Sequence, residues 1–119
     1  MNRTFIEVPS FTKKWYDLGF TDDELTKLEM ILLNDPEAGK MIEGTGGVRK
    51  IRVAFPNRGK SGSARVCYVD FAYYESTYFL IVFTKKEETN LSEEEKKNVR
   101  KLVKQLRSEL YQLRGDSDE

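Results

Sequence analysis

The spacing of apolar residues changes twice along this chain of 119 residues, and these two changes constrain its fold. Between residues 10 and 34 and after position 92, apolar residues recur at the period of an α-helix. Between Val48 and Thr84 they alternate with polar residues or form short continuous runs, which is typical of strands. A block of strands between two helical regions predicts an α+β domain with helices packed on a small sheet.

The first third of the chain predicts one strand and two helices. Residues 4–8 are β-prone and predict a short first strand. The first helix is expected to begin at Ser10, whose hydroxyl can act as an N-cap. Thr21 and Glu24 have the spacing of a capping box, which opens the second helix. An irregular loop is expected over residues 37–47, because they include Gly44, Gly46 and Gly47 and show no clear period.

The rest of the chain predicts three strands and a long helix. Val48–Phe55 and Ala64–Phe71 flank a turn-forming segment, so a hairpin is the simplest pairing. Tyr78–Thr84 is strongly apolar and is expected to be central in the sheet. Ser92 and Glu95 form a second capping box that opens the last helix. The predicted order is β-α-α-β-β-β-α, with an antiparallel-rich sheet, two N-terminal helices on one face and a long C-terminal helix.

Composition narrows the class of protein. One domain is expected over residues 1–115, followed by a disordered acidic tail over residues 116–119. No apolar run approaches the ~18 residues of a membrane span, and the N-terminus lacks a signal-peptide core, so a cytoplasmic location is expected. Cys67 is the only cysteine, which excludes a disulfide framework and a thiolate metal site. It lies in an apolar run and is predicted to pack as a small hydrophobe.

Basic residues are concentrated in the stretch from Gly44 to Val69. The chain balances 20 basic against 20 acidic residues, yet this stretch contains six cations and no acidic residue. Its cations are Arg49, Lys50, Arg52, Arg58, Lys60 and Arg65. One interpretation is a solvated strand surface that protects edges from mispairing. Solvated faces usually mix both signs of charge, however, so the segregation favours a surface that binds a phosphate backbone.

Two other patterns limit the chemistry of such a surface. The chain has no histidine, so proton transfer there would depend mainly on lysine and arginine. Gly59-Lys60-Ser61 is similar to the end of a nucleotide-binding P-loop, but Ala54 stands where its first glycine is required. A strand also follows instead of a helix, so a nucleotide-hydrolysing P-loop is rejected.

Two charged segments near the C-terminus have open interpretations. Lys85 and Lys86 follow the last strand and can extend the basic surface if that strand pairs beside Ala64–Phe71. Glu87 and Glu88 come next and are equally able to neutralise them. Residues 93–95 are all glutamates at the start of the last helix, which argues against a nucleic-acid role for that helix.

Two blocks of sequence together resemble the RelE/ParE superfamily of toxins. They are Gly-Thr-Gly-Gly-Val-Arg-Lys-Ile-Arg-Val-Ala at 44–54 and Gly-Lys-Ser-Gly-Ser-Ala-Arg-Val at 59–66. The HigB-like branch is the most similar, because it also carries a run like Phe-Thr-Lys-Lys-Glu-Glu-Thr-Asn-Leu-Ser at 83–92 before its last helix. The resemblance implies a RelE-like fold and a bacterial type II toxin that cleaves mRNA on the ribosome. It also implies a cognate antitoxin, usually of the helix-turn-helix type. The toxin would contact operator DNA only through this antitoxin.

The resemblance also implies a set of site residues. The implied catalytic residues are Arg65, Lys85 and Lys60. The implied contacts with RNA or the ribosome are Lys50, Arg52, Arg58, Lys86 and Phe83. The match leaves open whether Lys85 or Lys86 is the catalytic lysine. Some family members carry a tyrosine near the end of the last strand, where this chain has Phe83, and whether Tyr68 or Tyr78 replaces it is also open.

The expected chemistry uses the nucleophile of RNA itself, the 2′-OH beside the scissile phosphate. A lysine among other cations can act as the general base, and Arg65 can stabilise the charge that develops on the phosphorane. We expect a 2′,3′-cyclic phosphate product and no requirement for a metal ion or other cofactor. Two alternatives remain: a ParE-like toxin that binds DNA gyrase without nuclease activity, and an RNA-binding module that never cleaves.

Overall fold

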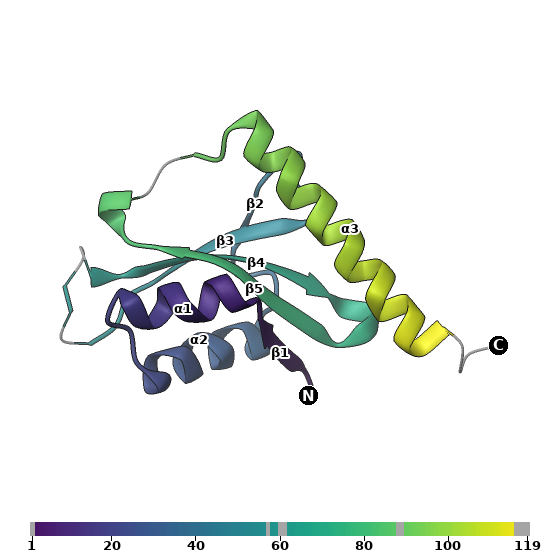
Figure 1. Cartoon of the computed structure of the whole chain (residues 1–119). Helices are drawn as coiled ribbons and strands as arrows, with labels where there is room; N and C mark the ends of the chain where they lie inside the picture. The colour runs from purple at the N-terminus through teal and green to yellow at the C-terminus, as the bar shows by residue number, and fades with distance from the viewer. Residues whose placement is uncertain (1, 57, 60–61, 88–89, 116–119) are drawn as a thin grey trace.

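The computed structural model of this chain describes residues 2–56, 58–59, 62–87 and 90–115. It has an α+β fold, as the sequence predicted, in which a five-stranded sheet lies between helices on both of its faces (Figure 1). The helices are α1 (Pro9–Asp17), α2 (Asp22–Asn34) and α3 (Glu93–Gly115). The strands are β1 (Thr4–Glu7), β2 (Lys40–Met41), β3 (Val48–Val53), β4 (Ala64–Phe71) and β5 (Ser76–Phe83).

The strand order across the sheet is β1-β5-β4-β3-β2. β1 runs parallel to β5, and the other neighbouring pairs are antiparallel. β4 is therefore the middle strand of the sheet. β5, which was expected to be central, is an interior strand that lies between β4 and β1. Both strands are buried along almost their whole length because helices cover both faces of the sheet.

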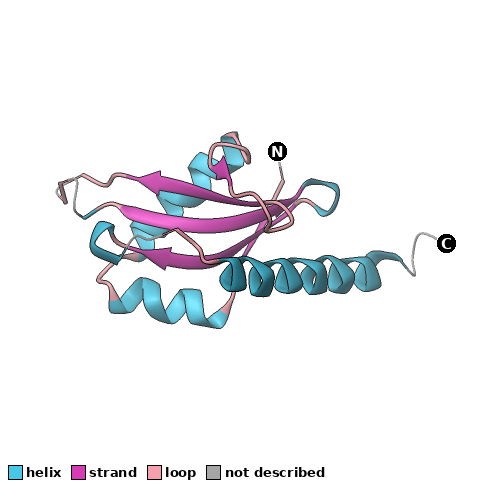
Figure 2. Cartoon of the chain, turned by 90° about the horizontal axis from the view of Figure 1, so that it is seen from above, coloured by secondary structure: helices cyan, strands magenta, loops and turns pink. Residues whose placement is uncertain are grey.

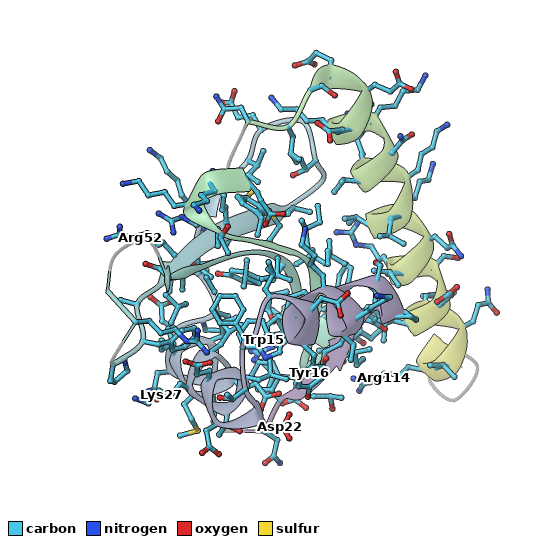
Figure 3. All side chains as sticks on the ribbon, turned by 60° about the vertical axis from the view of Figure 1, so that its left-hand side comes forward. Trp15, Tyr16, Asp22, Lys27, Arg52 and Arg114 are labelled. Carbon is cyan, nitrogen blue, oxygen red and sulfur yellow. The ribbon has the colours of Figure 1, made fainter. Side chains whose placement is uncertain are left out.

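One core cluster lies between the sheet and the two N-terminal helices. Trp15 and Leu28 are fully buried there against residues such as Val66 and Phe79. The predicted capping box of α2 is present: the Glu24 amide donates to the Thr21 hydroxyl over 3.1 Å, and the Thr21 amide donates to the Glu24 carboxylate over 2.9 Å. Figure 3 shows Trp15 pointing into the interior.

A second core cluster lies between the opposite face of the sheet and α3. Val103, Leu106 and Leu110 form the buried stripe of α3, and they pack against residues of β3, β4 and β5. The second predicted capping box, formed by Ser92 and Glu95, is also present. Figure 2 shows α3 running beside the sheet and continuing past the end of its strands.

Two predictions about the first half of the chain were wrong. α1 begins at Pro9 instead of Ser10, and its N-cap is Val8, because proline has the backbone geometry of a first helical residue. The expected loop over 37–47 contains the short strand β2, in which Lys40 pairs with Lys50 of β3. Two residues are too few to show an alternation, so the sequence carried no signal for this strand.

Two other predictions concern residues that the structure does not describe. The expected acidic tail over residues 116–119 and the candidate site residue Lys60 both lie outside the described residues. None of the described helices is long and apolar enough to cross a membrane.

Candidate functional site

Strand β3 divides its basic residues between the two faces of the sheet. Lys50 and Arg52 lie on the face that carries α3, whereas Arg49 lies on the opposite face beside Ile51. Arg49 donates to the backbone carbonyl of Gly39 over 2.8 Å, so it holds the segment before β2 in place.

The same face of the sheet brings Arg65 of β4 next to Arg52. Arg52 pairs with Arg65 in the β3–β4 register, and Arg65 pairs with Phe83 in the β4–β5 register. Arg52 is exposed and points outward (Figure 3), whereas Arg65 is only 4% exposed and donates to the Ser63 carbonyl over 3.3 Å. We call the surface formed by Lys50, Arg52 and Arg65 the basic face. The guanidinium of Arg65 in this face is therefore mostly covered, which the sequence did not predict.

A pocket of about 190 Å³ adjoins the basic face where the segment before α3 and the first turns of that helix cross the sheet. We call it the α3 pocket; among the residues that line it are Lys50, Cys67, Phe83, Asn90, Leu91 and Lys96. The Lys50 ammonium lies 5.9 Å from the centroid of the Phe83 ring. Among the described residues, no acidic side chain lines this pocket, so its two lysines give it a positive character.

Lys85 and Lys86 lie in the short 3₁₀ turn Lys85–Glu87, directly after β5. Both side chains are exposed, and Figure 1 places this turn at the same end of the sheet as the β3–β4 connection. Glu87 does not pair with them: its carboxylate accepts from Lys14 of α1 over 2.9 Å and from the Thr84 amide over 3.2 Å. Within the described part of the chain, neither lysine has an ion-pair partner.

Arg58 is not brought together with the other predicted contacts. Its guanidinium donates to both carboxylate oxygens of Glu24, over 2.5 and 2.9 Å, and to the Gly19 carbonyl over 2.7 Å. It also lies 5.0 Å from the centroid of the Phe20 ring. These hydrogen bonds from Arg58 lower the pKa of Glu24. Arg58 thus ties the β3–β4 connection to α2, and we leave it out of the basic face.

The two candidate tyrosines lie elsewhere. The Tyr68 hydroxyl donates to the Pro36 carbonyl over 2.8 Å and accepts from the Gly39 amide over 2.9 Å, on the side of the sheet that carries α1 and α2. Tyr78 is buried edge-on against Phe71, toward the other end of β5. Neither hydroxyl is therefore placed to replace a tyrosine at the position of Phe83.

Sequence reasoning missed the contribution of α3 to this region. Lys96 and Asn90 line the α3 pocket, but no local pattern distinguishes them from the other polar residues around the start of the helix. Cys67 is buried, as predicted, and it also lines the pocket. The described residues include no group of three or more Cys, Asp or Glu side chains arranged to hold a metal ion.

Comparison with known families agrees with this architecture. Residues 10–113 match the family described as the RelE toxin of the RelE/RelB toxin-antitoxin system. The matched segment includes all but one residue of α1, the whole of α2, the strands β2 to β5 and nearly all of α3, and therefore every residue of the basic face. A toxin of this kind has an antitoxin as its counterpart. The chain belongs to the RelE family of toxins from toxin-antitoxin systems.

Proposed function

We propose that this toxin is a ribosome-dependent mRNA endoribonuclease that inhibits translation. The observation that carries the proposal is the convergence of Lys50, Arg52 and Arg65 on one face of the sheet, beside the aromatic ring of Phe83. Such a face can hold a phosphate backbone, and an aromatic ring beside it can stack on a base. Such a combination can hold a single-stranded RNA, which a ribonuclease must do before it cleaves.

The reaction begins with attack of the 2′-oxygen on the neighbouring phosphorus. The 2′-oxygen–phosphorus bond forms, the bond from phosphorus to the 5′-oxygen breaks, and the products are a 2′,3′-cyclic phosphate and a 5′-hydroxyl. A base must take the 2′-OH proton, and an acid must supply one to the departing 5′-oxygen. Lys85 is our candidate for one of these roles, with Lys86 and Lys60 as the other lysines of the set.

Arg65 is the candidate that stabilises the extra negative charge on the phosphorane. A guanidinium offers paired hydrogen bonds to phosphate oxygens, which a lysine ammonium does not. The burial of Arg65 supports the assignment, because a donor already fixed in a partly dry site needs little reorganisation during the reaction. Arg52, at the exposed rim, contributes to binding the RNA strand.

The ribosome supplies the orientation of the strand, which provides much of the remaining acceleration. The cognate antitoxin keeps the toxin inactive, and an acidic segment of it is complementary to the basic face. The sequence resemblance to the HigB-like branch favours an antitoxin of the helix-turn-helix type, through which the pair would contact operator DNA. These roles place the toxin in the cytoplasm.

The test maps the 5′ ends of mRNA in cells that express the wild type, Arg65→Lys or Lys101→Gln. Arg65→Lys keeps the charge but removes the paired donors, so we expect cleavage to fall roughly 10²-fold or more. Lys101 is exposed on α3 away from the basic face, so Lys101→Gln should cleave like the wild type. Cuts should lie within translated coding sequence and end in a 2′,3′-cyclic phosphate.

Three outcomes would contradict the proposal. DNA damage without mRNA cuts would favour a ParE-like toxin that acts on gyrase. Salt-sensitive RNA binding without cleavage on translating ribosomes would favour a binding module. Wild-type levels of cleavage by Arg65→Lys would show that Arg65 is not a catalytic residue. Thermal unfolding of the purified variant shows whether it is folded.

A further inference from the structure

The α3 pocket has the composition of a nucleotide-binding site. We infer that it takes the base and the phosphate of one unpaired RNA nucleotide, so that the start of α3 forms part of the RNA site. The inference rests on the proposed function, because it assigns a nucleotide of the mRNA to this pocket. It extends that function by adding Lys96 and Asn90, which neither the basic stretch nor the family resemblance had pointed to.

The size of the pocket suits one planar ring system. The pocket is small, with a volume of about 190 Å³. Pockets for larger organic ligands usually exceed about 300 Å³. The ring of Phe83 supplies an aromatic wall, and Cys67 and Leu91 supply apolar contacts. Proteins that bind single-stranded RNA stack unpaired bases on aromatic side chains of this kind.

The polar groups of the pocket match the rest of a nucleotide. Lys50 approaches from β3 and Lys96 from α3, so two ammonium groups border the same space from different elements. Two cations around an apolar pocket favour a ligand that carries negative charge as well as a ring. The Asn90 side chain has both donors and an acceptor, which is what reading the edge of a base requires.

Glu93 and Glu95 at the start of α3 offset this positive character only in part. Glu95 is engaged in the capping box, where its carboxylate accepts from the Ser92 amide over 2.8 Å. Glu93 forms an ion pair with the Lys96 ammonium over 3.6 Å, but its side chain is 94% exposed, so water screens this pair and it is weak. The sequence argued against a nucleic-acid role for α3 because of these glutamates, and the inference instead assigns such a role to the side of the helix that carries Lys96.

Binding is tested without the ribosome and without cleavage. The isotope-labelled toxin is titrated by NMR with the four nucleoside 3′-monophosphates, with inorganic phosphate and with a short unstructured RNA. We expect the nucleotides and the RNA to shift the amide signals of Cys67, Phe83 and Asn90, and phosphate alone to leave the signals of Cys67 and Phe83 unchanged. Free nucleotides that bind while RNA does not would overturn the assignment to mRNA, and no shift at these positions would overturn the site.

A matched pair of variants separates the pocket from general charge. Lys96→Gln should weaken nucleotide binding about tenfold, the effect of losing one charged hydrogen bond. Lys97→Gln removes the same charge from the next residue, which is exposed and outside the pocket, so its affinity should stay at the wild-type value. Equal affinities for the two variants would contradict the inference.

A third variant links the pocket to sequence preference. Asn90→Ala should change which base is found beside the cut sites on translated mRNA. Unchanged cut-site preference, together with unchanged nucleotide affinity, would overturn the inference and leave the nuclease function standing. If the toxin bound nucleotides in the pocket but never cut mRNA, the pocket would be confirmed as a nucleotide site and the proposed nuclease function would be contradicted.

Discussion

Arg52 and Arg65 stand directly opposite each other across the antiparallel strands β3 and β4. Like charges in this position repel, and the burial of Arg65 weakens the screening of that repulsion by water. A sheet selected for stability alone would place a neutral or acidic residue opposite a buried arginine. This arrangement is consistent with the proposed role of the basic face in binding RNA.

Replacing the exposed member of this pair should separate stability from activity. Arg52→Gln removes the repulsion, so we expect the free energy of unfolding to rise by roughly 0.2–1 kcal/mol. The same change should lower translation-dependent mRNA cleavage several-fold, because a phosphate contact is lost. Urea unfolding measures the first effect and mapping of cut sites the second. A variant that is less stable than the wild type would show that the two guanidinium groups do not repel in the folded protein.

The Glu24–Arg58 pair should make stability depend on pH. Hydrogen bonds from Arg58 hold the pKa of Glu24 below its usual value of 4.5, so the unfolded chain binds this proton more readily than the folded one. The contribution is fully present above that usual value and is lost as the pH falls through the lowered pKa. Arg58→Gln should thus reduce the free energy of unfolding by about 1 kcal/mol at neutral pH, and by much less in acid.

Urea unfolding of both proteins between neutral pH and pH about 3 tests this expectation. Lys101→Gln serves as the control, because it removes a basic residue that has no ion pair with a described residue. A difference between the wild type and Arg58→Gln that stays constant over the whole range would show that the pair does not couple folding to protonation of Glu24.

The Tyr68 hydroxyl should be worth more to stability than that of an exposed tyrosine. Tyr68→Phe leaves the Pro36 carbonyl and the Gly39 amide without this partner in a buried position. We expect a loss of about 1–3 kcal/mol in the free energy of unfolding. Tyr111→Phe is the matched control, since that side chain is 58% exposed and should unfold like the wild type. Equal stabilities for the two variants would mean that water replaces the lost hydroxyl.

The Lys14–Glu87 ion pair links α1 to the turn that presents Lys85 and Lys86. Both partners are about 40% exposed, so the pair should add little to global stability. It should instead hold the turn in place. We therefore expect Glu87→Gln to lower kcat for mRNA cleavage several-fold, with KM and the thermal unfolding temperature nearly unchanged.

The reversed pair tests whether position or charge matters. The double variant Lys14→Glu with Glu87→Lys restores an ion pair and should recover most of the lost activity. Lys13→Gln removes the neighbouring pair with Asp17 on the same helix and should have no effect on cleavage. If the double variant cleaves mRNA as slowly as Glu87→Gln, the effect comes from the carboxylate of Glu87 itself and not from the ion pair.

Features that depend on contacts within about one helical turn or one strand were predictable. Both capping boxes join residues three positions apart, so the sequence displays each of them complete. The strict alternation of side chains along a strand likewise requires that Arg49 lies on one face of the sheet and Lys50 and Arg52 on the other. The short strand β2 was not predictable, because its partner in β3 defines it and its own two residues do not.

Features that depend on contacts between distant elements were not predictable. Arg58 and Glu24 are 34 residues apart, and no local pattern shows that this arginine pairs with a carboxylate instead of joining the basic face. In the same way, Lys96 follows three glutamates in the sequence but borders a pocket together with Lys50. Each of these contacts exists only because packing of the helices on the sheet brings the two elements together.

The amino-acid sequence by itself determined the class of fold, the faces of the strands and the segregation of positive charge into residues 44–69. Those properties follow from local periodicity and composition, which the linear order of residues contains. Only the tertiary structure decided that Arg65 is buried beside an exposed Arg52, that Arg58 is used to anchor α2, and that α3 completes a pocket. Burial and charge pairing are properties of neighbours in space, and the sheet places residues side by side that the sequence keeps far apart.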